Sequence, residues 1–316
     1  MRVLVTGAGG FVGAHLLRAL LQGGHQVWAT TQAGHAPPGG PAGARWLPLE
    51  LTARDSVDSV VAEARPERVF HLAAQSSVAE SLQDPLATWE TNATGTLRLV
   101  GALPPGCRLL FVSSAEVYGV VPEAEQPIGE ARGLRPTNPY AASKAAAEMA
   151  VLEAVARGAD AVVARSFSHT GPGQDARFAL GSFARQLAAV RAGAAEPVLR
   201  VGNLEARRDY LDVRDVVRAY LLLMERGERG GVYNVASGRP RAVRELVETL
   251  VALSGTGARL ETDPARVRPL DVPLLSGDAS ALRALGWEPV VPIERTLADL
   301  LEAEARQPGT PAAAAP

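Results

Sequence analysis

The sequence predicts an α/β fold in which helices cover both faces of a parallel sheet, together with a smaller α/β lobe. Two observations lead to this prediction. Short apolar runs alternate with stretches of helical periodicity through the first half of the chain. Such alternation is typical of a doubly wound parallel sheet, whose strands are buried on both faces. Beyond about residue 165 the alternation loosens, and proline- and glycine-rich pieces follow.

The apolar runs locate the strands and the periodic stretches locate the helices. The predicted strands are 2–5, 25–30, 68–74, 108–114 and 160–167. The predicted helices are 11–24, which two glycines close, 86–103, and 139–158, which begins at a proline and ends at a glycine. Proline in the first turn and glycine after the last turn are typical helix boundaries.

Composition excludes several classes of function. The 316 residues are 47% hydrophobic and 21% charged with a net charge of −2, which describes a globule without the basic surface of a nucleic-acid-binding protein. No apolar stretch is long enough for a membrane span, and the first residues lack the apolar run of a signal peptide. Cys107 is the only cysteine, which excludes an internal disulfide, and the five histidines show no metal-ligand spacing. We therefore expect a cytoplasmic protein without a metal.

A glycine-rich turn follows the first predicted strand and opens the first helix. Gly7, Gly10 and Gly13 stand at GxxGxxG spacing, with Phe11 and Val12 at the start of the helix. Such a turn lets the backbone approach a pyrophosphate, and the helix N-terminus supplies free N–H groups to the phosphates. The sequence therefore predicts a dinucleotide-binding domain of the Rossmann type.

The second strand ends where the adenosine ribose is normally recognised. An acid there favours NAD and a nearby arginine favours NADP. The strand ends in Thr30, Thr31 and Gln32, none of which is charged. We therefore expect NADP(H) or NAD(H) as the cofactor, with the choice between them open. Thr31 is expected to lie beside the cofactor.

Tyr140 and Lys144 lie one helical turn apart on the same face. Lys144 is the only lysine of the chain, so every other basic side chain besides histidine is arginine. A lysine offers a compact charge, which an arginine fork cannot imitate, and an ammonium beside a phenol is expected to lower the phenol pKa. Ser113 and Ser114 end the strand 108–114, where a doubly wound sheet places its ligands. Ser114, Tyr140 and Lys144 are therefore the predicted catalytic residues.

These motifs carry a resemblance to a known family. The chain resembles an extended short-chain dehydrogenase/reductase acting on nucleotide sugars. The matching pieces run over nearly the whole chain in family order: TGAGGFVG (6–13), HLAAQSSV (71–78), TNATGT (91–96), SSAEVYG (113–119), PYAASK (139–144), RRDYLDVRDVVRAY (207–220) and GDASALRALGWEP (277–289).

The resemblance implies further contacts. It assigns catalysis to the same serine, tyrosine and lysine. To the cofactor it assigns, besides the glycine turn, Glu50, Leu51, Leu72, Ala73 and Ala74. To the nucleotide-sugar substrate it assigns Gln75, Ser76, Ser168, Arg208, Arg268 and Asp271, with the two arginines on the diphosphate and the aspartate on the ribose. Ser168 departs from the family, which commonly has asparagine there.

The resemblance also implies a reaction. RSFSHTGPGQ (165–174) and VGNLEARRDYLDVRD (201–215) look most like the GDP-mannose branch. The expected reaction is NAD(P)H-dependent reduction of a nucleotide 4-keto-6-deoxy sugar, most similar to GDP-4-keto-6-deoxy-D-mannose giving GDP-D-rhamnose. Glu116 stands where related 4,6-dehydratases carry the base that removes the C5 proton, so a dehydratase is the alternative. A 4-epimerase stays open, and a non-catalytic dinucleotide sensor is a remote alternative.

Domain limits and assembly follow from the same comparison. Residues 1–165 and about 205–235 are predicted to form the dinucleotide-binding domain. About 166–204 and 236–307 are predicted to form the nucleotide-sugar lobe, and 308–316 a disordered tail. Because relatives pair two long helices across a two-fold axis, the apolar-faced helices predict a homodimer.

Overall fold

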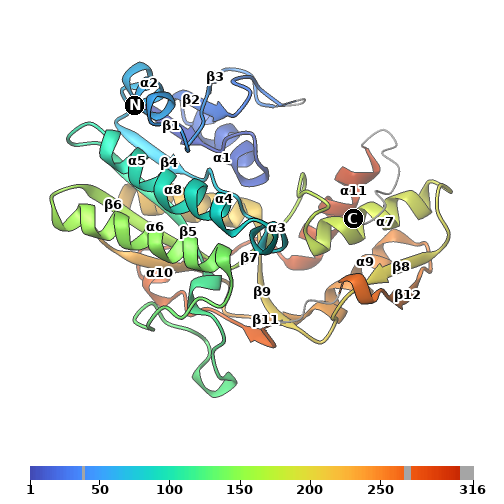
Figure 1. The fold of residues 1–316 in the computed structure, drawn as a ribbon. Helices are drawn as coiled ribbons and strands as arrows, with labels where there is room; N and C mark the ends of the chain where they lie inside the picture. The colour runs from blue at the N-terminus through green and yellow to red at the C-terminus, as the bar shows by residue number, and fades with distance from the viewer. Residues whose placement is uncertain (38–39, 267–271, 307–316) are drawn as a thin grey trace.

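The larger body of the protein is built on a parallel sheet. The structure, a computed structural model, describes residues 1–37, 40–266 and 272–306. Its main sheet has seven strands in the order β10-β6-β5-β4-β1-β2-β3, and all neighbours in it are parallel (Figure 1). The strands are β1 Arg2–Thr6, β2 Gln26–Thr31, β3 Arg45–Pro48, β4 Arg68–His71, β5 Arg108–Ser114, β6 Asp160–Ser166 and β10 Val232–Val235. The predicted doubly wound sheet is confirmed.

All five predicted strands belong to this sheet. Their apolar runs are buried on both faces: in β1, Val3 and Val5 face one core and Leu4 faces the other. The third predicted strand ends at His71 rather than at residue 74, because the chain leaves the sheet there to pass close to the glycine turn. The two edge strands β3 and β10 are four residues long, and their short runs gave no clear signal in the sequence.

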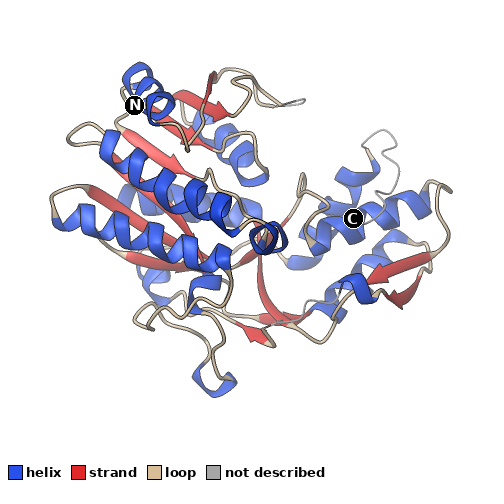
Figure 2. Cartoon of the chain, viewed as in Figure 1, coloured by secondary structure: helices blue, strands red, loops and turns tan. Residues whose placement is uncertain are grey.

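Helices cover both faces of the sheet (Figure 2). On one face are α1 Phe11–Gln22 and α8 Val213–Arg226, and on the other are α2 Arg54–Ala64, α5 Gly95–Ala102 and α6 Pro139–Ala156. Leu16, Leu17 and Leu20 of α1 bury their side chains in the first core. Helix α6 is rich in alanine, and its Ala147 and Val151 are fully buried in the second core. Because alanine side chains are small, α6 lies directly against the sheet.

Residues 85–102 form one continuous helical segment with an irregular middle. The helices α4 Pro85–Trp89 and α5 are joined by η1 Glu90–Thr94, a π-helical turn. A π turn contains an extra residue and often marks a functional position. The prediction of one regular helix over 86–103 is wrong in this respect, because apolar periodicity over so short a stretch does not reveal an inserted residue.

The smaller lobe has its own core. Its elements are α7 Ala179–Arg191, α9 Val243–Ser254, α11 Ile293–Ala305 and a two-stranded sheet of β8 Val198–Val201 and β12 Arg259–Thr262. Leu187, Leu250 and Leu300 of the three helices are fully buried together. A four-stranded sheet contains β7 Ser168–Thr170, β9 Arg207–Asp212, β11 Pro240–Ala242 and β13 Leu274–Leu275. Strand β9 contacts α8 of the larger body and α11 of the smaller lobe, so this sheet lies where the two meet.

The remaining elements are short. They are α3 Val78–Gln83, η2 Ala115–Tyr118, η3 Glu123–Glu125, η4 Pro264–Arg266 and α10 Ser280–Ala284. Within the described ranges, no helix is both long and apolar enough to span a bilayer. The predicted tail, 308–316, lies outside the described residues.

Candidate active site

The site lies at the carboxyl edge of the main sheet. The strand order reverses between β4 and β1, and ligands of such sheets bind in the crevice at that point. Thr6, His71, Ser114 and Ser166 end four neighbouring strands of this edge. The register pairs Thr6 with His71 and Ser114 with Ser166, whereas His71 pairs with Phe111, so β5 and β6 extend three residues further than β1 and β4. The functional residues predicted from three separate motifs thus come from adjacent strand ends.

The glycine turn has the shape that a dinucleotide phosphate requires. Gly7 has φ +69, and a Cβ there would lie 2.7 Å from the Ala73 backbone nitrogen. A Cβ on Gly13 would lie 2.5 Å from the Gly7 carbonyl oxygen. A Cβ on Gly10 would lie 3.3 Å from the same carbonyl oxygen, a closer contact than side chains normally make. Close backbone packing therefore favours glycine at all three positions, and the turn leads into the N-terminus of α1, whose free N–H groups suit a phosphate.

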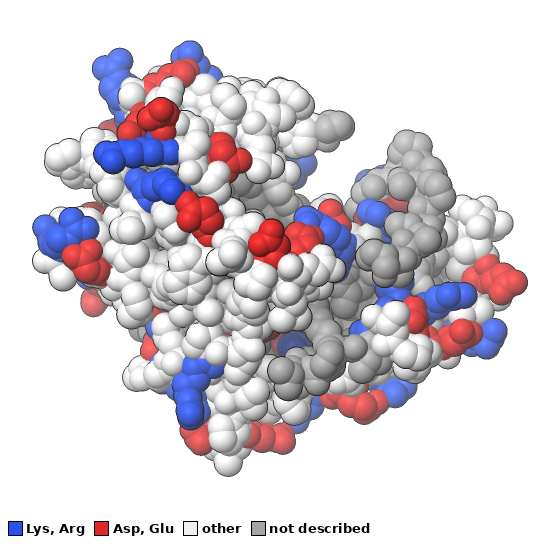
Figure 3. Space-filling model, in the orientation of Figure 1, with Lys and Arg blue, Asp and Glu red and all other residues white. Residues whose placement is uncertain are grey.

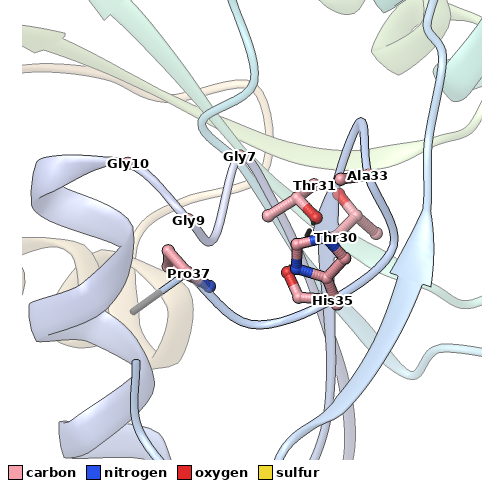
Figure 4. Close-up of a pocket in the computed structure, with 8 residues that line it drawn as sticks. All are labelled: Gly7, Gly9, Gly10, Thr30, Thr31, Ala33, His35 and Pro37. Atoms are coloured by element: carbon pink, nitrogen blue, oxygen red, sulfur yellow. Dashed lines mark hydrogen bonds between the residues drawn. The ribbon is translucent and has the colours of Figure 1, made fainter. Parts of the chain in front are cut away.

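A pocket of about 380 Å³ opens beside this turn (Figure 4). It is lined by Gly7, Gly9, Gly10, Thr30, Thr31, Ala33, His35 and Pro37. The Thr31 hydroxyl donates to the His35 carbonyl oxygen at 3.1 Å, which holds the following loop against the strand end. None of the described residues that line the pocket is acidic, so no carboxylate stands here to accept from a ribose. The pocket and the turn fit the adenosine end of a dinucleotide.

The other predicted cofactor residues surround the same crevice. Phe11 and Val12 open α1 and are partly exposed. Leu72, Ala73 and Ala74 follow β4 and are also partly exposed. Glu50 accepts from the backbone and hydroxyl of Thr52 at 3.0 and 2.8 Å, and these bonds hold the pKa of its carboxyl below the usual range. Leu51 is 5% exposed and packs into the core, so only its backbone is open to a ligand.

Ser114, Tyr140 and Lys144 are brought together as predicted. Ser114 ends β5, and Tyr140 and Lys144 lie in the first turns of α6, whose N-cap residue Asn138 accepts from the Ala141 backbone at 2.8 Å. The Ser114 side chain lies close enough to the Tyr140 phenol to lower its pKa, in opposition to burial. Lys144 is 4% exposed, and its Nζ lies 4.6 Å from the centroid of the Phe111 ring. The three side chains share one strand end and one helix face.

The titration of this trio differs from the expectation. Burial raises the pKa of Tyr140 to about 12, the negative charge of Glu116 adds to the rise, and the hydrogen bond with Ser114 opposes it. Burial lowers the pKa of Lys144 to about 7, while the charge of Glu148 opposes that fall. The phenol pKa is therefore raised and not lowered as expected, with the loss of hydration as the largest cause. Sequence spacing places the two side chains but does not show that Tyr140 is half-buried and Lys144 is 4% exposed.

Glu116 lies beside the phenol. It belongs to the short helix η2 directly after Ser114, and the Asn138 amide donates to its Oε2 at 3.2 Å. Its charge acts on Tyr140, as the raised phenol pKa indicates. The structure thus brings the candidate base of the alternative reaction into the same site.

Asn92 is a site residue that the sequence analysis did not single out. It lies in the π turn η1, is 1% exposed, and its Nδ2 donates to the Gln75 carbonyl and the Ser143 hydroxyl, each at 2.9 Å. The Ser143 hydroxyl in turn donates to the Tyr140 carbonyl at 2.8 Å. Asn92 therefore fastens the loop after β4 to the first turn of the catalytic helix. A buried asparagine inside an otherwise apolar helix was the available signal.

The predicted substrate residues are placed only in part. Gln75 folds back on its own loop, where its amide donates to the Ser77 carbonyl at 3.0 Å, and Ser76 is exposed. Ser168 and Arg208 lie on the paired strands β7 and β9, where Ser168 stands opposite Tyr210. Arg268 and Asp271 lie outside the described residues.

The sheet order, the glycine turn and the serine–tyrosine–lysine arrangement define an extended short-chain dehydrogenase/reductase. The family described as GDP-mannose 4,6 dehydratase matches residues 4–300. GDP-6-deoxy-D-mannose reductase of Pseudomonas aeruginosa is 39% identical over 305 residues, which are 95% of this chain and 96% of that protein. The chain belongs to the GDP-mannose 4,6 dehydratase family.

Further relatives and solved structures share the fold, and some of them are epimerases. UDP-glucose 4-epimerase of Streptomyces lividans is 32% identical over 304 residues, 91% of each chain. The solved structure of RMD from Pseudomonas aeruginosa complexed with NADPH has a TM-score of 0.84 and 36% identity, covering 96% of this chain and 99% of that one. Thermus thermophilus UDP-glucose 4-epimerase in complex with NAD has a TM-score of 0.85 and 31% identity, covering 97% and 100%.

Proposed function

We propose that this protein reduces the 4-keto group of a nucleotide-linked 4-keto-6-deoxy sugar, with GDP-4-keto-6-deoxy-D-mannose giving GDP-D-rhamnose and NADPH or NADH as the cofactor. The observation that carries the proposal is the likeness to GDP-6-deoxy-D-mannose reductase of Pseudomonas aeruginosa over 95% of this chain, joined to the placement of Ser114, Tyr140 and Lys144 at the sheet edge. A phenol whose pKa is raised to about 12 holds its proton at physiological pH and can donate it. A reduction needs a proton donor at the sugar oxygen, whereas oxidation of a hydroxyl would need the phenolate as a base.

Each site residue would have a separate role in such a reduction. When bound, the reduced nicotinamide supplies a hydride to C4 of the sugar. Tyr140 holds the proton that the ketone oxygen takes up, and the Ser114 hydroxyl, which acts to lower the phenol pKa, stabilises the phenolate that this transfer leaves. The ammonium of Lys144 on the next helical turn favours the same charge. The glycine turn and the residues after β4 would hold the dinucleotide across the sheet edge.

The substrate contacts complete the proposal. Ser168 and Arg208 come from the sheet where the larger body meets the smaller lobe, so they are suited to hold the sugar and its diphosphate. We assign Gln75, Ser76, Arg268 and Asp271 to the substrate as well. Residues 1–165 and about 205–235 would then serve the cofactor, and about 166–204 and 236–307 the nucleotide sugar.

A 4,6-dehydratase is the second candidate, because of Glu116. That carboxylate lies close enough to Tyr140 to raise the pKa of its phenol, which is where a base for the C5 proton must stand. Dehydration starts with oxidation of the sugar C4 hydroxyl, in which the oxidised nicotinamide would take the hydride and Tyr140, as the phenolate, would take the proton. A 4-epimerase needs the same first step. A non-catalytic dinucleotide sensor would not need the buried tyrosine and lysine.

One pair of incubations tests the reaction. The protein is given GDP-mannose without reduced cofactor, and separately GDP-4-keto-6-deoxy-D-mannose with NADPH or NADH. We expect consumption of reduced cofactor in the second incubation and none of GDP-mannose in the first. Glu116→Gln should change the reduction rate by less than about tenfold, as should the control Glu302→Gln on the exposed face of α11. Consumption of GDP-mannose that Glu116→Gln abolishes would establish the dehydratase instead.

We also propose that the protein is a cytoplasmic homodimer. The helices α4, α5 and α6 expose large apolar side chains: Leu86 at 82%, Trp89 at 45%, Leu97 at 49% and Met149 at 49%. Figure 3 shows that much of the surface over these helices carries no charge. A two-fold axis would cover the same patch on both copies. Light scattering should give the mass of a dimer for the wild type and of a monomer for Trp89→Glu, whereas Val290→Glu, at an exposed position elsewhere, should stay dimeric.

A further inference from the structure

A buried ion pair lies directly beneath the catalytic residues. Glu148 and Arg165 are 0% and 5% exposed, and the Arg165 guanidinium contacts the Glu148 carboxylate at 2.5 Å. The Ser113 hydroxyl donates to Glu148 Oε2 at 2.8 Å. Glu148 therefore links three elements of the site: α6, which carries Tyr140 and Lys144, β5, which carries Ser113 and Ser114, and β6.

The position of Glu148 relative to Lys144 is set by the helix. Both belong to α6 and are four residues apart, so their side chains leave the same face one turn from each other. In water such a pair contributes little, but both residues are buried, and charges interact more strongly in a low dielectric. Lys144 thus has a buried carboxylate on one side and the Phe111 ring on another.

We propose that Glu148, fixed in place by Ser113 and Arg165, is a positioning residue that keeps Lys144 in its charged form. A buried ammonium tends to lose its proton, since desolvation penalises the charged form. Glu148 counters that tendency without contacting the reacting atoms, and Arg165 limits the effect by neutralising part of the carboxylate charge. The ion pair would therefore set how much of the positive charge of Lys144 is present beside Tyr140.

Other ionisable groups around Lys144 leave this assignment intact. They are Tyr140 on α6, His71 on β4, Glu116 and Tyr118 on η2, and Arg165 on β6. Burial and the charge of Lys144 lower the pKa of His71 to about 3, so it is neutral at working pH, and burial raises the pKa of Tyr118. On the helices packed against α6, the charged Glu80 and Glu90 are held in exposed pairs with Arg177 and Arg98. Glu148 is the carboxylate whose charge raises the Lys144 pKa.

The single lysine of the chain permits a direct test. Protein grown with lysine labelled with ¹³C at Cε gives one lysine resonance, whose pH titration reports Lys144 alone. We expect the midpoint of Glu148→Gln to fall by about one pH unit or more relative to the wild type, because an opposite charge at this range shifts a pKa by about 1–3 units. Arg165→Gln should move the midpoint upward, since it frees the Glu148 charge. Glu148→Asp, which keeps the charge, should stay close to the wild type.

The opposite directions of the two midpoint shifts distinguish a positioning residue from a purely structural ion pair. A purely structural ion pair would lower the thermal stability of both variants and leave the lysine midpoint unchanged. Midpoints of Glu148→Gln and Arg165→Gln within about 0.3 pH units of the wild type would overturn the proposal. If Glu148→Gln does not fold, the direction of Arg165→Gln decides. The effect on catalysis rests on the proposed function. The titration needs neither substrate nor cofactor, so a failure of the positioning role of Glu148 can be distinguished from a failure of the proposed function.

Discussion

Replacing Lys144 by methionine should stabilise the fold while it abolishes activity. Burial lowers the lysine pKa from 10.5 to about 7, so the folded protein holds the charged form at a cost. At about 1.36 kcal/mol per unit, this lowering corresponds to roughly 5 kcal/mol. The cost is fully present below pH 7, where folded and unfolded lysine are both charged. It fades between pH 7 and 10.5, where only the unfolded lysine keeps its proton, and is absent above.

Urea unfolding of the wild type and Lys144→Met at about pH 6, 8 and 10 measures this effect. Because methionine has similar length and no charge, we expect a gain of about 2–5 kcal/mol at about pH 6 that shrinks steadily toward pH 10. Arg157→Met, which removes an exposed charge at the end of the same helix, should give a difference that does not change over this range. A Lys144→Met variant no more stable than the wild type at the lowest pH, or a gain independent of pH, would refute the reasoning.

Three further predictions concern the same site. Tyr140→Phe should lower kcat by about 10²–10⁴-fold with KM within a few-fold, because only the proton donor is lost, and steady-state kinetics check this. Lys144→Arg should also lose turnover, although it keeps the charge, because the buried position beside the Phe111 ring suits a compact ammonium and not a planar fork. A rate near that of the wild type would contradict this. Gly13→Ala should weaken dinucleotide binding and cost about 1–3 kcal/mol, since its Cβ would meet the Gly7 carbonyl at 2.5 Å. Calorimetry measures both, with Gly101→Ala as the control, because nothing lies within 4 Å of a Cβ in that helical position.

The sheet was predictable from sequence because its central strands are buried on both faces. Such strands need continuous apolar runs, and the run in β5 ends at Ser114 both in the prediction and in the structure. The edge strands β3 and β10 pair on one side only and are short, so local composition does not distinguish them from loops. The placement of Ser114, Tyr140 and Lys144 was predictable because residue spacing in a helix fixes a shared face, and a strand end fixes the edge of the sheet; their catalytic role stays a prediction.

The features that the sequence did not reveal depend on how deeply side chains are buried and on contacts between distant segments. The π turn adds one residue within a helical pattern, and its result is the placement of Asn92 between Gln75 and Ser143. The raised pKa of Tyr140 follows from burial by several elements, which a spacing of four residues cannot indicate. The contact between Glu148 and Arg165 joins a helix to the following strand, where either residue alone resembles an ordinary surface charge.

Lys144 and Arg165 show why this arginine-rich chain retains one lysine. An arginine has five N–H donors, and Arg165 directs four of them to Glu148, the Tyr118 hydroxyl and the Glu130 carbonyl oxygen. The position of Lys144 offers an aromatic ring at 4.6 Å and a carboxylate one turn away, which suit a compact ammonium but not a planar fork. An arginine also keeps its proton at every accessible pH, whereas a lysine with a pKa of about 7 responds to its surroundings. The two buried cations are therefore not interchangeable. Arg165 joins elements of the site through its hydrogen bonds, whereas the charge of Lys144 depends on the groups around it.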